Sequence, residues 1–78
     1  MLTGVQIRMA RSAIGWSAEY LASECGIASK TVRRLESVNG SLSSKSKSVS
    51  KIKVALEAAG IEFIGTPEDG PGIRIHAR

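Results

Sequence analysis

The sequence contains little of what metal-binding, disulfide-bonded and membrane proteins depend on. Its 78 residues include one cysteine, Cys25, and one histidine, His76. A single cysteine cannot form an internal disulfide, and one cysteine with one distant histidine lacks the ligand spacing of a zinc site. No apolar run approaches the ~20 residues of a membrane-spanning helix, and no secretory signal peptide is recognisable. These absences favour a cytoplasmic protein with no metal ion or other cofactor and no membrane contact.

A recognisable catalytic arrangement is also missing. The sequence has no glycine-rich phosphate-binding loop, no pair of acids in a plausible cleft and no nucleophile with an adjacent base. We therefore expect a binding protein rather than an enzyme.

Positive charge is present in excess, and it is unevenly distributed. The formal net charge is +4 at pH 7. Residues 28–53 hold seven Lys or Arg and one Glu, whereas residues 1–27 are balanced and residues 54–78 are net acidic. A basic middle third is typical of a domain that binds a polyanion. A solvated helix face would have the same composition, so charge alone leaves both interpretations open.

Residues 17–37 predict two short helices joined by a tight corner. Small and apolar residues recur at helical spacing in the first half, at Ala18, Leu21, Ala22 and Cys25. Gly26 ends this helix, and the second helix begins near residue 28 and turns Val32 and Leu35 inward. The opposite face of the second helix is polar and cationic, with Ser29, Lys30, Arg33 and Arg34.

The flanking residues predict two more helices, a loop and a hairpin. Residues 1–14 form a helix that begins with a Thr3–Gln6 capping box. Residues 38–48 have no periodicity and predict a flexible, cationic, serine-rich loop, and residues 49–59 then form a helix. The alternation after residue 60 predicts a β-hairpin. Since two strands alone are marginal in water, the hairpin either packs on the preceding helix or pairs with a second copy.

The corner segment resembles the helix-turn-helix domain of the Xre/Cro/phage-repressor family. That family has a small residue in the first helix, glycine in the turn and an aliphatic residue in the second helix. This chain has Ala22, Gly26 and Val32 in the same relative positions. The phrases ALEAAGIEFI and GPGIRI likewise resemble the end of many short bacterial Xre-type regulators. The resemblance implies a mainly α, four- to five-helix, lambda-repressor-like domain over residues 1–60, with a C-terminal β-hairpin over residues 61–78 packed on it.

The resemblance also implies a function, that of a sequence-specific DNA-binding transcriptional regulator. Residues 29–37 would be the recognition helix in the major groove, and a homodimer would repress by covering two half-sites about 34 Å apart. The candidate DNA-contacting residues are Ser17, Ser29, Lys30, Thr31, Arg33, Arg34, Lys45 and Lys47. In the family, an arginine at the position of Arg11 pairs with a glutamate at the position of Glu36, so we expect a structural ion pair between these two side chains.

Two positions depart from the family pattern. Ala18 stands where the family usually carries a glutamine that hydrogen-bonds a phosphate, and Ala28 replaces a polar residue common at the start of the recognition helix. A second hypothesis is therefore a protein-binding module, an anti-activator or antitoxin-like partner that sequesters another regulator protein. Such a module needs an exposed apolar patch, for which Trp16 and Tyr20 are the candidates.

Overall fold

Thr3 and Gln6 form the capping box that begins the first helix. The protein is described by a computed structural model that covers residues 2–38, 40–43, 45–66 and 68–76. The Thr3 hydroxyl accepts from the backbone N–H of Gln6 at 3.2 Å, and the Gln6 side chain accepts from the backbone N–H of Thr3 at 2.9 Å. The helix α1 accordingly spans Gly4–Ala13. It is shorter than the predicted 1–14; residue 1, like the last two residues of the predicted hairpin segment, lies outside the described residues.

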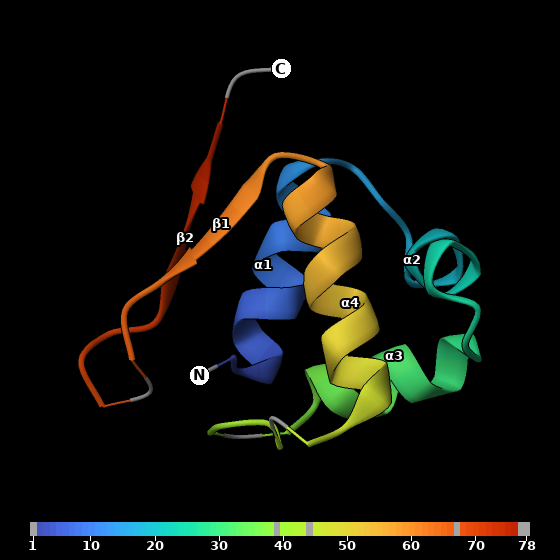
Figure 1. The fold of residues 1–78 in the computed structure, drawn as a ribbon, viewed down its shortest axis with the longest axis horizontal. Helices are drawn as coiled ribbons and strands as arrows, with labels where there is room; N and C mark the ends of the chain where they lie inside the picture. The colour runs from blue at the N-terminus through green and yellow to red at the C-terminus, as the bar shows by residue number, and fades with distance from the viewer. Residues whose placement is uncertain (1, 39, 44, 67, 77–78) are drawn as a thin grey trace.

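Four helices and one antiparallel hairpin make up the described part of the chain (Figure 1). After α1 come α2 (Ala18–Cys25), α3 (Ser29–Glu36), α4 (Lys47–Ala58), β1 (Ile61–Ile64) and β2 (Gly72–Ile75). The helices α1 and α4 stand side by side, with the hairpin on one side, α2 on the other and α3 across the foot of the pair. The prediction of a mainly α fold with a C-terminal hairpin is confirmed at this level.

The core is built from the faces that helical spacing predicts. Each helix contributes at least one side chain with no accessible surface, namely Ile7, Leu21, Val32, Ile52 and Leu56. Full burial of each such side chain contributes about 1.5–3 kcal/mol. The five side chains come from four different helices, so no single helix supplies the core by itself. The four helices therefore depend on one another for their packing.

The corner between α2 and α3 has the predicted glycine stop, and α2 begins at a serine cap. The Ser17 hydroxyl caps α2 by accepting from the Tyr20 backbone N–H at 3.0 Å. Gly26 ends α2 in the left-handed conformation, with φ of +68°, which a residue with a Cβ rarely adopts. Ile27 then packs against the core, and α3 begins two residues later.

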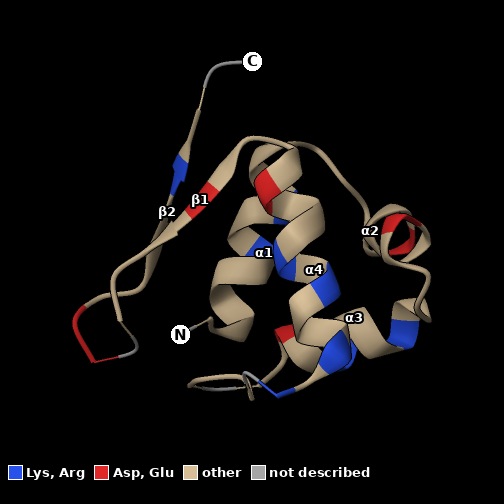
Figure 2. Cartoon of the chain, viewed as in Figure 1, with Lys and Arg blue, Asp and Glu red and all other residues tan. Residues whose placement is uncertain are grey.

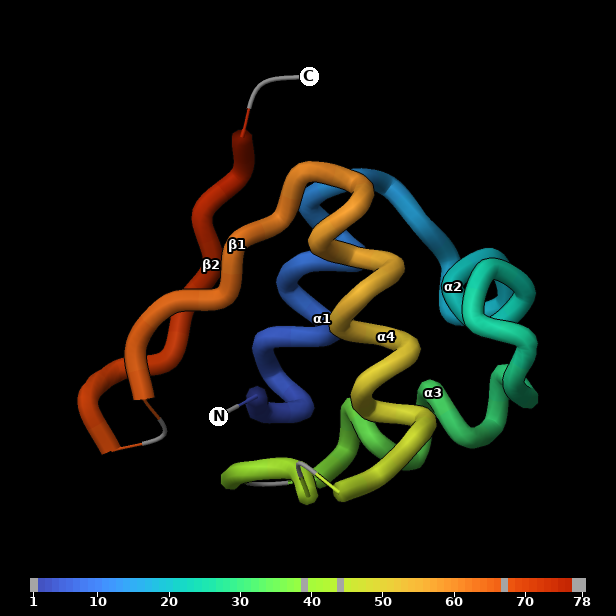
Figure 3. Tube along the Cα trace, in the orientation of Figure 1, coloured from blue at the N-terminus to red at the C-terminus, as the bar shows by residue number. Residues whose placement is uncertain are grey.

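The connection between α3 and α4 differs from its prediction. Figure 3 shows it passing below the N-terminal end of α1. There Leu42 is buried, and its backbone N–H donates to the Leu2 carbonyl at 2.8 Å. The Ser46 hydroxyl caps α4, which begins at Lys47 rather than at residue 49. The loop is therefore shorter than the predicted 38–48, and its buried Leu42 cannot be predicted from periodicity, since one leucine in a polar run creates none.

The hairpin packs on its own domain, with β2 against α1 and β1 against α4. Gln6, which has no accessible surface, fixes it by donating from Nε2 to the carbonyls of Ile64 and Gly72 at 3.1 and 2.8 Å. Since Ile64 and Gly72 are paired in the ladder, this one amide holds both strands to α1.

The outer face of the hairpin carries a small charged cluster. The Glu62 carboxylate contacts His76 Nε2 at 2.7 Å and Arg74 Nη1 at 3.2 Å. The hydrogen bond with His76, with a further contribution from Arg74, lowers the pKa of Glu62. All three side chains are largely exposed, so this cluster contributes little to stability.

Substitution of Gln6 tests how the hairpin is attached. Gln6→Ala leaves two strand carbonyls without their donor and removes half of the capping box. We expect a loss of about 2–4 kcal/mol in the free energy of unfolding, measured by urea denaturation. Arg8→Ala, an exposed position of the same helix, is the control and is expected to change stability by less than about 0.5 kcal/mol. Equal effects of the two substitutions would contradict the tethering role of Gln6.

Candidate nucleic-acid interface

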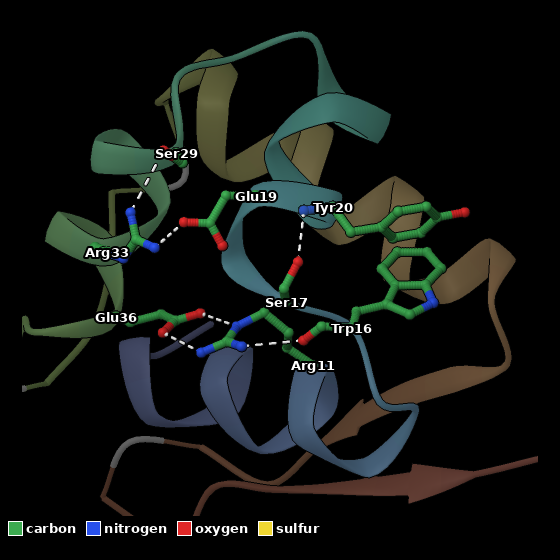
Figure 4. A network of polar contacts seen from close by, with 8 residues as sticks. All are labelled: Arg11, Trp16, Ser17, Glu19, Tyr20, Ser29, Arg33 and Glu36. Atoms are coloured by element: carbon green, nitrogen blue, oxygen red, sulfur yellow. Dashed lines mark hydrogen bonds and ion pairs between the residues drawn. The ribbon is translucent and has the colours of Figure 1, made fainter.

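A bidentate ion pair joins the end of α3 to α1 (Figure 4). Arg11 Nε donates to Glu36 Oε2 at 2.7 Å and Arg11 Nη2 donates to Glu36 Oε1 at 3.0 Å. The third contact runs from Arg11 Nη1 to the Trp16 carbonyl at 3.0 Å. The hydrogen bonds with Glu36 raise the pKa of Arg11, although partial burial acts in the opposite direction. The structure thus brings Arg11 and Glu36 together in the ion pair that the family resemblance implies.

This pair belongs to a small set of contacts that orient α3. Val32 and Glu36 are the buried residues of α3. The start of α1 also approaches α3 closely, because a Cβ on Gly4 would lie 2.4 Å from the Leu35 carbonyl oxygen. An apolar side chain, an ion pair and a backbone contact therefore fix one side of α3 and leave the other side exposed.

The exposed side of α3 carries the predicted DNA-contacting residues. Lys30, Arg33 and Arg34 are exposed, whereas Ser29 and Thr31 are half-buried. Arg33 Nη1 lies 3.4 Å from the Ser29 hydroxyl, and Arg33 Nη2 pairs with the Glu19 carboxylate of α2. The pairing with Glu19 could not be found by inspecting α3 alone, because it requires the angle at which α2 meets α3.

Most cations of the basic segment 28–53 have no acidic partner among the residues that the structure describes. Within the described residues, only Arg33 and Lys53 of that segment form ion pairs, Lys53 with Glu57 at 3.8 Å. The one acid of the segment, Glu36, is already paired with Arg11. Five cations without an ion pair to a described residue remain, Lys30, Arg34, Lys45, Lys47 and Lys51. Figure 2 shows the Lys and Arg residues of α3, α4 and the segment before α4 in blue.

Two of these cations lie where the backbone itself is positive. Lys30 is in the first turn of α3 and Lys47 is in the first turn of α4, and neither first turn holds an acid. A helix N-terminus carries about half a positive charge and favours anions by roughly 0.3–1 kcal/mol. A lysine there is repelled by the positive helix N-terminus. A polyanion bound at that place would be attracted both by the lysine and by the helix N-terminus.

Ala18, which stands where the resembled family usually carries a glutamine, is buried, with 5% of its surface accessible, and offers no side-chain donor to a phosphate. Ser17, the preceding cap, is exposed. Its hydroxyl can donate a hydrogen bond to a phosphate while its oxygen accepts one from the Tyr20 backbone N–H. Ala28 makes no side-chain cap at α3.

The candidate protein-binding residues lie on a different side of α2. The rings of Trp16 and Tyr20 meet edge to face, with centroids 4.8 Å apart. Trp16 is half-buried against the core, and Tyr20 is 48% exposed. Figure 4 shows the two rings pointing away from Arg33 and Glu19. The two candidate surfaces are therefore separate.

Neither a metal centre nor a membrane span is found in the described ranges. These residues contain no group of three His, Cys, Asp or Glu side chains suited to a metal ion. None of the four helices has the length and apolar character needed to cross a membrane. Burial raises the pKa of the Cys25 thiol, which disfavours the reactive thiolate.

No protein-family model matches this sequence, and no curated protein matches it significantly.

Substitution of Glu36 tests whether the ion pair holds α3. Glu36→Gln leaves the Arg11 charge 20% exposed without its counter-ion, so we expect a loss of about 2–4 kcal/mol in the free energy of unfolding. Glu24→Gln removes the same charge at an exposed position and should change stability by less than about 0.5 kcal/mol. Thermal or urea unfolding followed by circular dichroism distinguishes them, and comparable losses would show that the pair does not hold α3.

Proposed function

We propose that the protein is a sequence-specific DNA-binding transcriptional regulator of the Xre/Cro/phage-repressor type, with a lambda-repressor-like fold. In this function α3 is the recognition helix and enters the major groove with its exposed face. The observation that carries the proposal is the exposed cationic face of α3, held in one orientation by the Arg11–Glu36 pair.

The residues of this face have complementary roles. Ser29, Lys30 and Arg34 are the base readers, since arginine and lysine recognise the O6 and N7 atoms of guanine. Thr31 and Arg33 contact the backbone or a thymine methyl group. Ser17, Lys45, Lys47 and Lys51 bind phosphates and contribute affinity that does not depend on sequence but falls with salt.

In this proposal the protein represses transcription simply by occupying its DNA site. A homodimer covers two half-sites about one helical turn apart, ~34 Å, and blocks access of polymerase. The exposed outer edge of the hairpin, where Ile75 is 57% accessible, and the outer face of α4, where Val54 is 66% accessible, are the surfaces for a second copy. The proposed compartment is the cytoplasm, where the DNA of a bacterial cell lies.

Arg34 provides the sharpest test of this function. Wild type should enrich a preferred duplex from a random-sequence library, and its affinity should fall steeply between about 50 and 200 mM salt. Arg34→Ala should lose about 1–3 kcal/mol of discrimination between that duplex and an unrelated one. The measurement is fluorescence anisotropy with both duplexes.

The control for this test removes an equal charge elsewhere. Arg8→Ala, on the exposed side of α1, should weaken binding to both duplexes equally and keep the discrimination. Failure to enrich any sequence, or an equal loss of discrimination in both variants, would contradict a recognition role for α3.

A second candidate function rests on the exposed Tyr20 ring. An aromatic pair on a surface separate from the basic face is suited to bind another protein, as an anti-activator or antitoxin-like module would. In that case the chain would bind no duplex at low salt, and Tyr20→Ala would abolish binding to its protein partner. If the DNA-binding function holds, Tyr20→Ala leaves the affinity for the selected duplex unchanged within about twofold.

A further inference from the structure

Arg33 is the one cation on the face of α3 that has an acidic partner among the described residues. Its Nη2 pairs with the Glu19 carboxylate, and its Nη1 lies 3.4 Å from the Ser29 hydroxyl. Figure 4 shows the guanidinium reaching from α3 toward the start of α2. Both charged side chains are more than half exposed, so the pair lies on the surface that a duplex would meet.

Glu19 is unusual in its position as well as in its partner. It is the one acid in the first turn of any of the four helices. A carboxylate there is stabilised by the helix N-terminus, which explains its presence on α2 without reference to DNA. That stabilisation falls off within the first turn and does not by itself require an arginine of α3 beside the carboxylate.

The ion pair changes what Arg33 can contribute to DNA binding. A free arginine that meets a phosphate releases a counter-ion from the DNA, and this release drives sequence-independent affinity. Arg33 must first leave Glu19, whose carboxylate then takes up a cation from solution. The exchange of carboxylate for phosphate therefore releases no net ion, and the exposed Glu19 charge remains to repel the backbone.

We infer that Glu19 is a specificity-determining residue, which suppresses sequence-independent DNA affinity by holding Arg33 as its counter-ion. This inference rests on the proposed function and assigns a role that neither the basic face nor the base readers supply. A duplex that places a matching base edge, such as a thymine methyl group, against Arg33 recovers the lost contact, whereas a random duplex offers Arg33 only its phosphates. Glu19 thereby increases the ratio of specific to non-specific binding.

The test is a double-substitution cycle on non-specific duplex DNA across a range of salt concentrations. Glu19→Gln should raise the affinity about 3- to 10-fold near 0.1 M salt and steepen the slope of log K against log salt by about 0.9, the value of one phosphate contact. Arg33→Ala should lower the affinity of wild type, because Glu19 then repels the backbone without a counter-ion, and it should cancel the gain in the Glu19→Gln background. With the preferred duplex the gain should be smaller, so that Glu19→Gln lowers the specificity ratio.

Glu24→Gln is the matched control, because it removes the same charge from an exposed position of α2 that forms no ion pair with a described residue. Circular dichroism melting curves of all variants establish that each is folded. An unchanged slope in Glu19→Gln, or an equal gain in Glu24→Gln, would overturn the role of Glu19 while leaving the proposed function intact. If wild type and variants all fail to bind duplex DNA at low salt, the proposed function and this inference fall together.

Discussion

The contact on which the arrangement most depends is the bidentate pair between Arg11 and Glu36. Helix α3 has eight residues, and an isolated helix of that length is unstable in water. It is stable here because Val32 is buried, Gly4 allows α1 to approach, and Glu36 accepts hydrogen bonds from Arg11, whose guanidinium pairs with no other carboxylate of the described residues. The same guanidinium donates to the Trp16 carbonyl, so one side chain joins α1, the segment before α2 and the end of α3.

Gln6 plays the corresponding role on the other side of α1. A hairpin of two four-residue strands is marginal alone, and this one is held by the amide of a fully buried side chain and by packing on α1 and α4. The contacts of Arg11 and Gln6 lie on opposite sides of the same helix, which makes α1 the element that both the hairpin and α3 are fixed to. A rigid support of this kind is what a surface needs if it is to read the edges of base pairs.

The sequence predicts the periodic parts of this structure and misses the contacts that periodicity does not encode. Helical spacing identifies Leu21 and Val32 as core, and Gly26 marks the end of α2, because each acts within one turn of chain. Leu42, the two strand carbonyls bound by Gln6 and the Glu19–Arg33 pair were beyond such reasoning, since they depend on how distant elements meet. The Arg11–Glu36 pair was available from the family resemblance alone; charge and spacing would not have selected it from the other acids and arginines.

The most direct test of α3 as a DNA-binding face is a titration of isotope-labelled protein with duplex DNA, followed by amide chemical shifts in an NMR spectrum. The proposed function predicts that the largest shifts fall on residues 28–34 and on residues 45–51, and that they decrease as salt is added. Amides of the hairpin, 61–64 and 72–75, should barely move. Shifts centred instead on Trp16 and Tyr20, or no shifts at low salt, would contradict a role of α3 in binding DNA.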